Sequence, residues 1–187
     1  MLSSFSVFLY RVASWKLLLL TVLLFALFPT YILKNLAARM NAAAGHEVGP
    51  IDLVFGYDPA RVIRMVAAYG SEGRAIYAQG EMTADIAYPI VYTFMACVIL
   101  SLLFRNRTYV PFRAVNVLPV AILIIDLIEN ACIVFLLRAY PRSSVALASF
   151  CSAVTNLKWV VLFAVVGLIL YGLLRLAIGS ENRLRTN

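Results

Sequence analysis

Long apolar runs separated by short polar stretches dominate the chain. Mostly apolar runs cover residues 17–33, 86–104 and 117–137, and a longer run covers residues 145–174. A helix needs about 20 predominantly apolar residues to cross the hydrocarbon core of a bilayer. The pattern therefore predicts four transmembrane helices, of which the last must tilt or project beyond the bilayer because of its length.

Two prolines and an asparagine mark details of these helices. Pro29 is predicted to kink the first helix, because proline interrupts the backbone hydrogen bonds. The Asn116 side chain is predicted to cap the third helix, with Pro119 tolerated in its first turn. A signal peptide is the competing interpretation of the first run, with a cleavage site at alanines 42–44. A signal peptide usually has an apolar stretch of about 7–15 residues, so the longer run favours a retained helix.

The composition agrees with a membrane protein. Of the 187 residues, 63% are hydrophobic and 13% are charged, and the mean hydropathy is +0.90. A soluble domain has about 45–50% apolar and about 25% charged residues. We therefore expect an all-α integral membrane protein, a four-transmembrane-helix bundle that forms a single membrane domain over residues 1–187.

The segment at residues 35–84 is too long for a plain connection between two spans. Asp58 followed by Pro59 predicts the start of a short amphipathic helix, which Gly70 is expected to end. A second helix is predicted from Ser71 into the second span. This extracytoplasmic helical segment forms either an interfacial cap on the bundle or a lid over a cavity.

The basic residues set the expected orientation. The N-terminal segment, the loop at residues 105–113 and the C-terminal tail carry several basic residues and one acid, Glu181, whereas residues 35–84 carry acids as well as basic residues. Basic segments stay on the cytoplasmic side, so both termini are expected in the cytoplasm, at a bacterial inner membrane. Membrane orientation also explains the net charge of +7 without a nucleic-acid partner.

The third apolar run contains Asp126, Glu129 and Asn130, whose spacing places all three on one face of a helix. A charge at the bilayer centre costs at least about 2.5–3.5 kcal/mol. Two acids on one face also repel each other. One of the two is therefore expected to be protonated or to contact a cation.

Lys158 is the only basic residue inside an apolar run. If the third and fourth helices form an antiparallel hairpin that turns at residues 140–141, Asp126 lies level with Thr155 and within reach of Lys158. Glu129 then has no cation at its level. Asp126 is thus the predicted partner of Lys158, and Glu129 is the predicted protonated acid.

Further polar residues predict a funnel that descends from the outer surface to these acids. Pro89 stands four residues after Asp85, so it frees the Asp85 carbonyl and kinks the second span. Besides the acids and Lys158, the predicted ligand-binding residues are Asn130, Asp85, Tyr88, Tyr92, Tyr77, Arg74 and Thr155, with Arg138 near the same mouth. Alternatively, the serine, threonine and tyrosine residues only hold the helices together.

Three functions fit this pattern. The first is binding of a membrane lipid or lipophilic small molecule, or a role as a subunit of a membrane assembly with a homo-oligomeric or other membrane-complex partner. The second is a membrane-embedded acid/base enzyme of isomerase, cyclase or epoxide-opening type, with Glu129 as general acid and Asp126, oriented by Lys158, as base or cation stabiliser. The third is proton-coupled transport through Glu129.

No cofactor or metal is expected. His46 is the only histidine and the three cysteines are scattered. The chain has no phosphate-binding glycine loop, no H-E-x-x-H and no C-x-x-C. These absences disfavour haem, zinc and nucleotide chemistry.

Overall fold

The computed structural model describes residues 2–105, 114–142 and 144–184, and this part of the chain is helical with no strand. The elements in chain order are α1 (Leu2–Val12), α2 (Trp15–Leu27), the π-helical turn η1 (Phe28–Ile32), α3 (Leu33–Ala44), α4 (Pro59–Ala68), α5 (Gly70–Glu81), α6 (Ala84–Phe104), the 3-10 turn η3 (Val115–Val117), α7 (Pro119–Ala139) and α8 (Val145–Leu184). Most of the loop at residues 105–113, on which the orientation argument partly depends, lies outside the described residues, as do residues 185–187.

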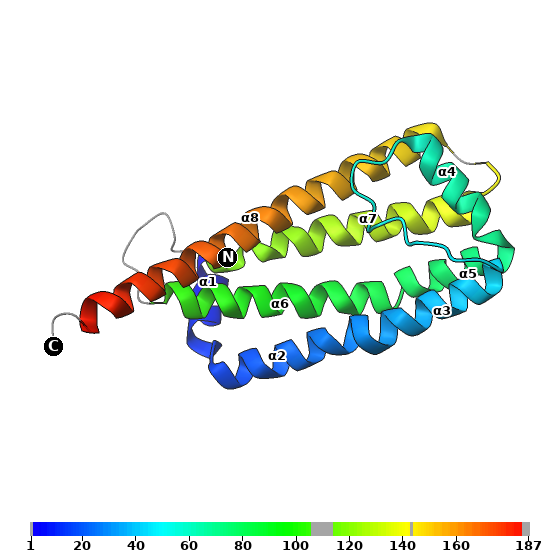
Figure 1. Ribbon diagram of the computed structural model, residues 1–187. Coiled ribbons are helices and arrows are strands. Elements are labelled where there is room, and N and C mark those ends of the chain that lie inside the picture. Colours follow the sequence, from blue (N-terminus) through cyan, green and yellow to red (C-terminus); the bar gives the residue numbers. More distant parts are fainter. Residues whose placement is uncertain (1, 106–113, 143, 185–187) are drawn as a thin grey trace.

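Four helical stretches are long and apolar enough to cross a membrane: Trp15–Ala44, Gly70–Phe104, Val115–Ala139 and Val145–Ile178. They lie side by side in an elongated bundle (Figure 1). α7 packs antiparallel to α8, α6 packs against both, and α2 packs against α6. The prediction of an all-helical chain with four such helices is thereby confirmed. Because α1 and the last turns of α8 lie at one end of the bundle, we call this the α1 end, and the opposite end the α4 end.

The first long helix extends beyond the predicted span at residues 17–33. It continues through η1 into α3 and ends at Ala44, where Gly45 adopts a φ of 74°. Pro29 lies at the start of η1, where a wider π-helical turn accommodates a residue that has no N–H to donate. α3 packs against α5, and this tertiary contact maintains the helix after the apolar run has ended.

The two short helices at the α4 end follow the local signals in the sequence. The Asp58 side chain accepts a hydrogen bond from the Arg61 N–H at 2.8 Å, and Pro59 is the first residue of α4. Gly70, the first residue of α5, adopts a φ of 66° where the chain turns from α4 into α5. α5 does not run unbroken into α6 as predicted, because Met82 and Thr83 interrupt the helix before Ala84.

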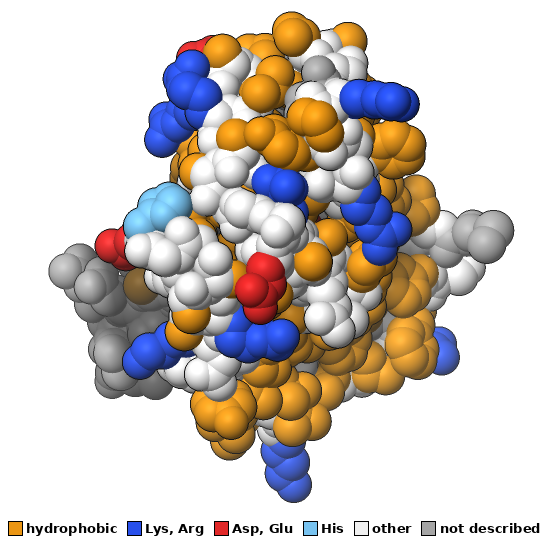
Figure 2. Space-filling model, turned by 90° about the vertical axis from the view of Figure 1, so that its right-hand side faces the viewer, with side chains coloured by type: hydrophobic (Ala, Val, Ile, Leu, Met, Phe, Trp, Pro, Cys, Tyr) orange, Lys and Arg blue, Asp and Glu red, His pale blue; other side chains and the backbone are white. Residues whose placement is uncertain are grey.

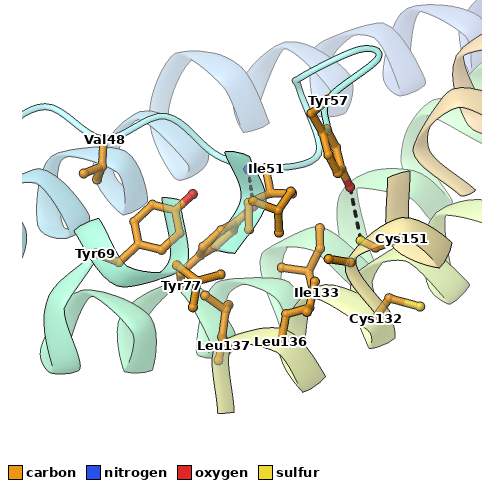
Figure 3. Close-up of a cluster of buried hydrophobic side chains, with 14 of the residues drawn as sticks. Val48, Ile51, Tyr57, Tyr69, Tyr77, Cys132, Ile133, Leu136, Leu137 and Cys151 are labelled. Carbon is orange, nitrogen blue, oxygen red and sulfur yellow. Dashed lines mark hydrogen bonds between the residues drawn. The ribbon is translucent and has the colours of Figure 1, made fainter. Parts of the chain in front are cut away.

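A buried cluster beneath α4 fixes the irregular segment at residues 45–58. Ile51 is fully buried and its N–H donates to the Tyr77 hydroxyl at 2.8 Å (Figure 3). Tyr57 is buried too, and its carbonyl accepts a hydrogen bond from Ser152 at 2.7 Å. The segment therefore covers the α4 end of the bundle as a packed cap, with its own apolar side chains in the core.

The α1 end contains a helix that the sequence analysis did not predict, and it changes the role of Asn116. The Asn116 side chain accepts a hydrogen bond from the Ser6 hydroxyl of α1 at 2.6 Å and donates to the Ser101 hydroxyl at 3.0 Å. α7 begins after Leu118 with no side-chain cap, and Pro119 is its first residue. The prediction that Asn116 caps α7 is wrong, because η3 intervenes and Asn116 is buried between α1 and α6.

Candidate functional site

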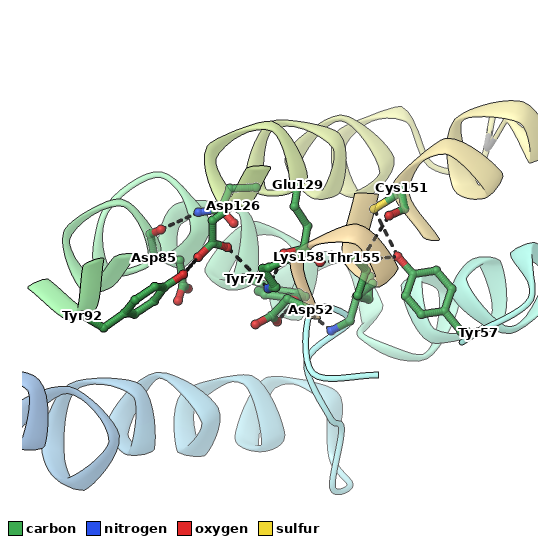
Figure 4. A network of polar contacts seen from close by, with 12 residues as sticks. Asp52, Tyr57, Tyr77, Asp85, Tyr92, Asp126, Glu129, Cys151, Thr155 and Lys158 are labelled. Atoms are coloured by element: carbon green, nitrogen blue, oxygen red, sulfur yellow. Dashed lines mark hydrogen bonds and ion pairs between the residues drawn. The ribbon is translucent and has the colours of Figure 1, made fainter. Parts of the chain in front are cut away.

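The polar residues of α7 face the interior of the bundle, as their spacing predicts. Asp126 and Asn130 are each 5% exposed and Glu129 is 0% exposed. Neighbouring helices supply partners to all three, so the polar face of α7 is stabilised by tertiary contacts (Figure 4).

Lys158 contacts both acids rather than Asp126 alone. Its Nζ atom lies 3.4 Å from Asp126 Oδ1 and forms a closer ion pair with Glu129 Oε2. The Thr155 hydroxyl donates to the other oxygen of Glu129. The prediction that Glu129 lacks a cation at its level is therefore wrong.

The error arises from the position of the hairpin turn. α7 ends at Ala139 and α8 begins at Val145, so the connection is centred near residue 142 rather than at residues 140–141. With this centre, each residue of α8 lies opposite a residue of α7 about one helical turn closer to the α4 end than predicted. Thr155 is therefore level with Glu129 and not with Asp126. Side chains on a helix lean toward its N-terminus. In two antiparallel helices, Lys158 and Glu129 therefore lean toward each other.

Two side-chain hydrogen bonds connect α7 to α6. The Tyr92 hydroxyl donates to Asp126 Oδ2, so one carboxylate contacts both a tyrosine and a lysine. The Asn130 amide donates to the backbone carbonyl of Asp85. Pro89 cannot donate to that carbonyl, as the sequence predicts, and the Asn130 amide takes the place of the missing donor.

Asp52 belongs to this cluster although the sequence analysis did not select it. It lies in the cap segment near Lys158, and the Tyr77 hydroxyl donates to its Oδ1 atom at 3.0 Å (Figure 4). Burial raises the pKa of Asp52, while the Lys158 ammonium and the Tyr77 hydroxyl act in the opposite direction. The only signal for Asp52 in the sequence is that it is an acid between two apolar residues in an irregular segment.

Tyr57 extends the polar contacts from Glu129 toward the α4 end. Its hydroxyl lies 3.1 Å from the Thr155 hydroxyl and donates to the Cys151 sulfur at 3.3 Å. Burial of the phenol raises the pKa of Tyr57, so it stays neutral. Tyr57 was not predicted either, because only the folding of the cap segment brings it to α8.

A cavity of about 380 Å³ lies between α2, α6, α7 and α8 and ends at this cluster. Its walls are apolar, and include Phe25 of α2, Ala96 and Ile99 of α6, and Leu162 and Val166 of α8. The polar residues that line it are Asp52, Asp85, Tyr88, Tyr92, Asp126, Asn130 and Lys158. The cavity is thus mostly apolar, with three carboxyl groups and one ammonium at its polar end.

The structure does not bring all predicted site residues to this cavity. Glu129 and Thr155 lie behind Asp126 and Lys158 and do not line it. Tyr77 turns into the core toward Asp52. Arg74, three residues earlier on α5, points to a separate surface hollow that Arg138 also lines, so the prediction of one funnel for these residues is wrong.

Comparison of this chain with models of known protein families, with curated proteins and with solved structures finds no match. Within the described residues, no group of three histidine, cysteine or acidic side chains is placed to hold a metal ion. The hydrogen bond from Tyr92 to Asp126 and the ion pair of Asp126 with Lys158 make hydrogen bonding, charge pairing and proton transfer available at this cluster.

Proposed function

We propose that this protein is inserted in a membrane through its four long helices and binds an amphiphilic lipid or lipophilic small molecule in the cavity. Large apolar side chains on the outside of the bundle support insertion: Leu23, Phe135 and Phe163 are 62%, 69% and 62% exposed. Such surface is unfavourable in water but is suited to lipid.

The proposed orientation places the α1 end in the cytoplasm. Exposed Glu47 at the α4 end and exposed Ser4 at the α1 end provide sites for a test, because the native cysteines are all buried. In intact cells, a membrane-impermeant maleimide is expected to label E47C and not S4C. Labelling of S4C alone would reverse the orientation. Labelling of neither variant in intact cells, but of both after the cells are lysed, would contradict insertion.

The observation that carries the binding proposal is the division of the cavity into apolar walls and a charged end. Binding sites for small molecules are typically about 300–1,000 Å³, mostly apolar, with few polar groups that orient the ligand. The apolar walls suit a hydrocarbon chain or ring. The carboxyl groups of Asp85 and Asp126 suit a head group that donates hydrogen bonds, such as a hydroxyl or an amine.

Filling the cavity tests the proposal directly. Ala96 lines the cavity, so A96F fills it, whereas Ile90 of the same helix is 50% exposed and I90F adds the same ring on the outer surface. The proteins are purified in mild detergent and the retained lipophilic molecules are measured by mass spectrometry. We expect a molecule that is retained by the wild type and I90F and lost from A96F. Equal retention by all three would overturn the proposal.

A second candidate is an acid/base enzyme that acts on the bound molecule. The observation that favours it is the contact between the Tyr92 hydroxyl and Asp126, because both residues line the cavity and Lys158 contacts the same carboxylate. In this candidate Tyr92 and Asp126 exchange the proton with the substrate, and Glu129 holds Lys158 from behind. Incubation with a lipid extract is expected to give a product with the wild type and none with Y92F. Product formation by Y92F would exclude this assignment.

A further inference from the structure

A second hollow lies at the α4 end, between α5 and the end of α7. It has a volume of about 390 Å³ and shares no lining residue with the cavity near Asp126. We call it the arginine hollow, because Arg74 and Arg138 line it, together with Ser71, Gln79 and Tyr140 and with smaller or apolar residues of both helices. Figure 2 looks at this end of the molecule, where basic side chains are spread over the surface and acidic ones are few.

Both arginines make contacts within the protein that leave most of their N–H donors unused. The Arg74 guanidinium lies 4.2 Å from the centre of the Tyr140 ring and donates to the Val66 carbonyl at 3.3 Å. Arg138 donates to the Met82 sulfur at 3.1 Å. A guanidinium has five N–H donors, so each arginine has further donors for a ligand. Because the contacts with Tyr140 and Val66 already position the Arg74 side chain, a ligand loses less binding energy to the ordering of this arginine.

The charge of the hollow is positive. No aspartate or glutamate is among the residues that line it. Glu72 stands two residues from Arg74 and therefore projects from a different side of α5. Glu81, at the end of the same helix, is 1% exposed and turns into the protein. An anion in the hollow thus meets two guanidinium groups and no repelling carboxylate from its walls.

The space between the arginines exists because small residues form the floor. Ala75 and Ala78 lie between Arg74 and Met82 on the same side of α5. Ala75 is exposed, so a larger side chain at this position is accommodated by the hollow itself without disturbing the core. This arrangement allows the shape of the hollow to be tested separately from its charge.

We propose that the arginine hollow binds a phosphate group, either of an anionic phospholipid head group or of a free phosphate. Arginine is suited to phosphate because its planar group donates two parallel hydrogen bonds to a pair of oxygens. Arg138 lies in the last turn of α7, where the apolar stretch ends, which is the level at which lipid phosphates meet a spanning helix. The site is distinct from the proposed cavity and does not depend on its ligand.

The test uses the full-length protein in detergent micelles that contain phosphatidylglycerol, with bound lipid counted by native mass spectrometry. R74Q and R138Q are each expected to lower phosphatidylglycerol retention at least about tenfold, since a hydrogen bond to a charged group contributes about 1.5–3 kcal/mol. A75L is expected to lower it with both arginines intact. R61Q is the matched control, because Arg61 is exposed on α4 outside the hollow, and it is expected to behave as wild type.

Several outcomes would overturn the proposal. Unchanged retention in R74Q and R138Q would refute it, and so would an equal loss in R61Q, which would indicate unspecific surface attraction. If the arginines serve only to fasten the helices, their variants lower the unfolding temperature without changing lipid retention. Addition of millimolar inorganic phosphate separates the two sources. Displacement of the lipid shows that the phosphate group suffices, and persistence of the lipid assigns the site to the phospholipid.

Discussion

Replacing Lys158 with methionine removes the cation that contacts both buried acids of α7. In the wild type, Lys158 Nζ forms ion pairs with Asp126 and Glu129, and all three side chains are at most 10% exposed. Methionine has a similar length but carries no charge. The variant therefore leaves two carboxyl groups without their cation, while the volume of the side chain is largely kept.

The expected cost follows from the burial of the pair. Removing one partner of a buried ion pair destabilises a protein by about 3–5 kcal/mol. For a chain of this length, 1 kcal/mol corresponds to a shift of about 2–4 °C in the unfolding temperature. We therefore expect K158M to unfold about 6–20 °C below the wild type, measured in detergent micelles by the loss of helical circular dichroism.

Two further variants make the result specific. K16M removes an exposed lysine at the start of α2, and it is expected to change stability by no more than about 0.5 kcal/mol. The triple variant K158M/D126N/E129Q removes the cation and both acids, and it is expected to regain most of the loss. If K158M unfolds at the wild-type temperature, or if the triple variant is no better than K158M, the ion pairs do not have the role assigned to them.

Three other predictions concern single residues. Burial raises the folded-state pKa of Asp52. The wild type is therefore expected to lose stability as the pH rises from about 4 through that pKa. The unfolding temperature of D52N is expected to depend less on pH over the same window. N116A is expected to cost about 1–3 kcal/mol and to increase cleavage of α1 by added protease, because Asn116 holds α1; unchanged cleavage would contradict this. N130A leaves the Asp85 carbonyl without its donor and is expected to cost about 1–3 kcal/mol. The double variant P89A/N130A is expected to recover part of that loss, because alanine at position 89 restores an N–H in α6.

The long helices were predictable because lipid-crossing segments require a long apolar run, and such runs are visible without knowledge of the tertiary structure. The predicted runs at residues 86–104 and 117–137 correspond closely to α6 and α7. α1 was not predicted, since an apolar stretch of Leu2–Val12 is too short for a span and is stabilised by contacts with α6. The continuation of the first helix to Ala44 depends in the same way on packing against α5.

The candidate site was only partly predictable. Helical spacing placed Asp126, Glu129 and Asn130 on one inward face. The position of Pro89, four residues after Asp85, identified the carbonyl that lacks a backbone donor. The pairing with Lys158 required the alignment of two helices, which depends on the centre of a short connection. A shift of about one helical turn brought Glu129, as well as Asp126, into contact with Lys158. Asp52 was not predictable, because no periodic pattern determines where the side chains of an irregular segment point.

The corrected pairing determines which acid of α7 lines the cavity, and the two hollows differ in the charge of the side chains that line them. Glu129 holds Lys158 from behind, so the cavity presents the carboxyl groups of Asp52, Asp85 and Asp126 and only one ammonium. An anionic head group entering there meets like charge in a region of low dielectric, where repulsion is strong. The arginine hollow presents two guanidinium groups and no carboxylate. If both proposals hold, a phosphate-bearing lipid binds in the surface hollow and is excluded from the cavity, whereas a molecule with an amine or hydroxyl head binds in the cavity.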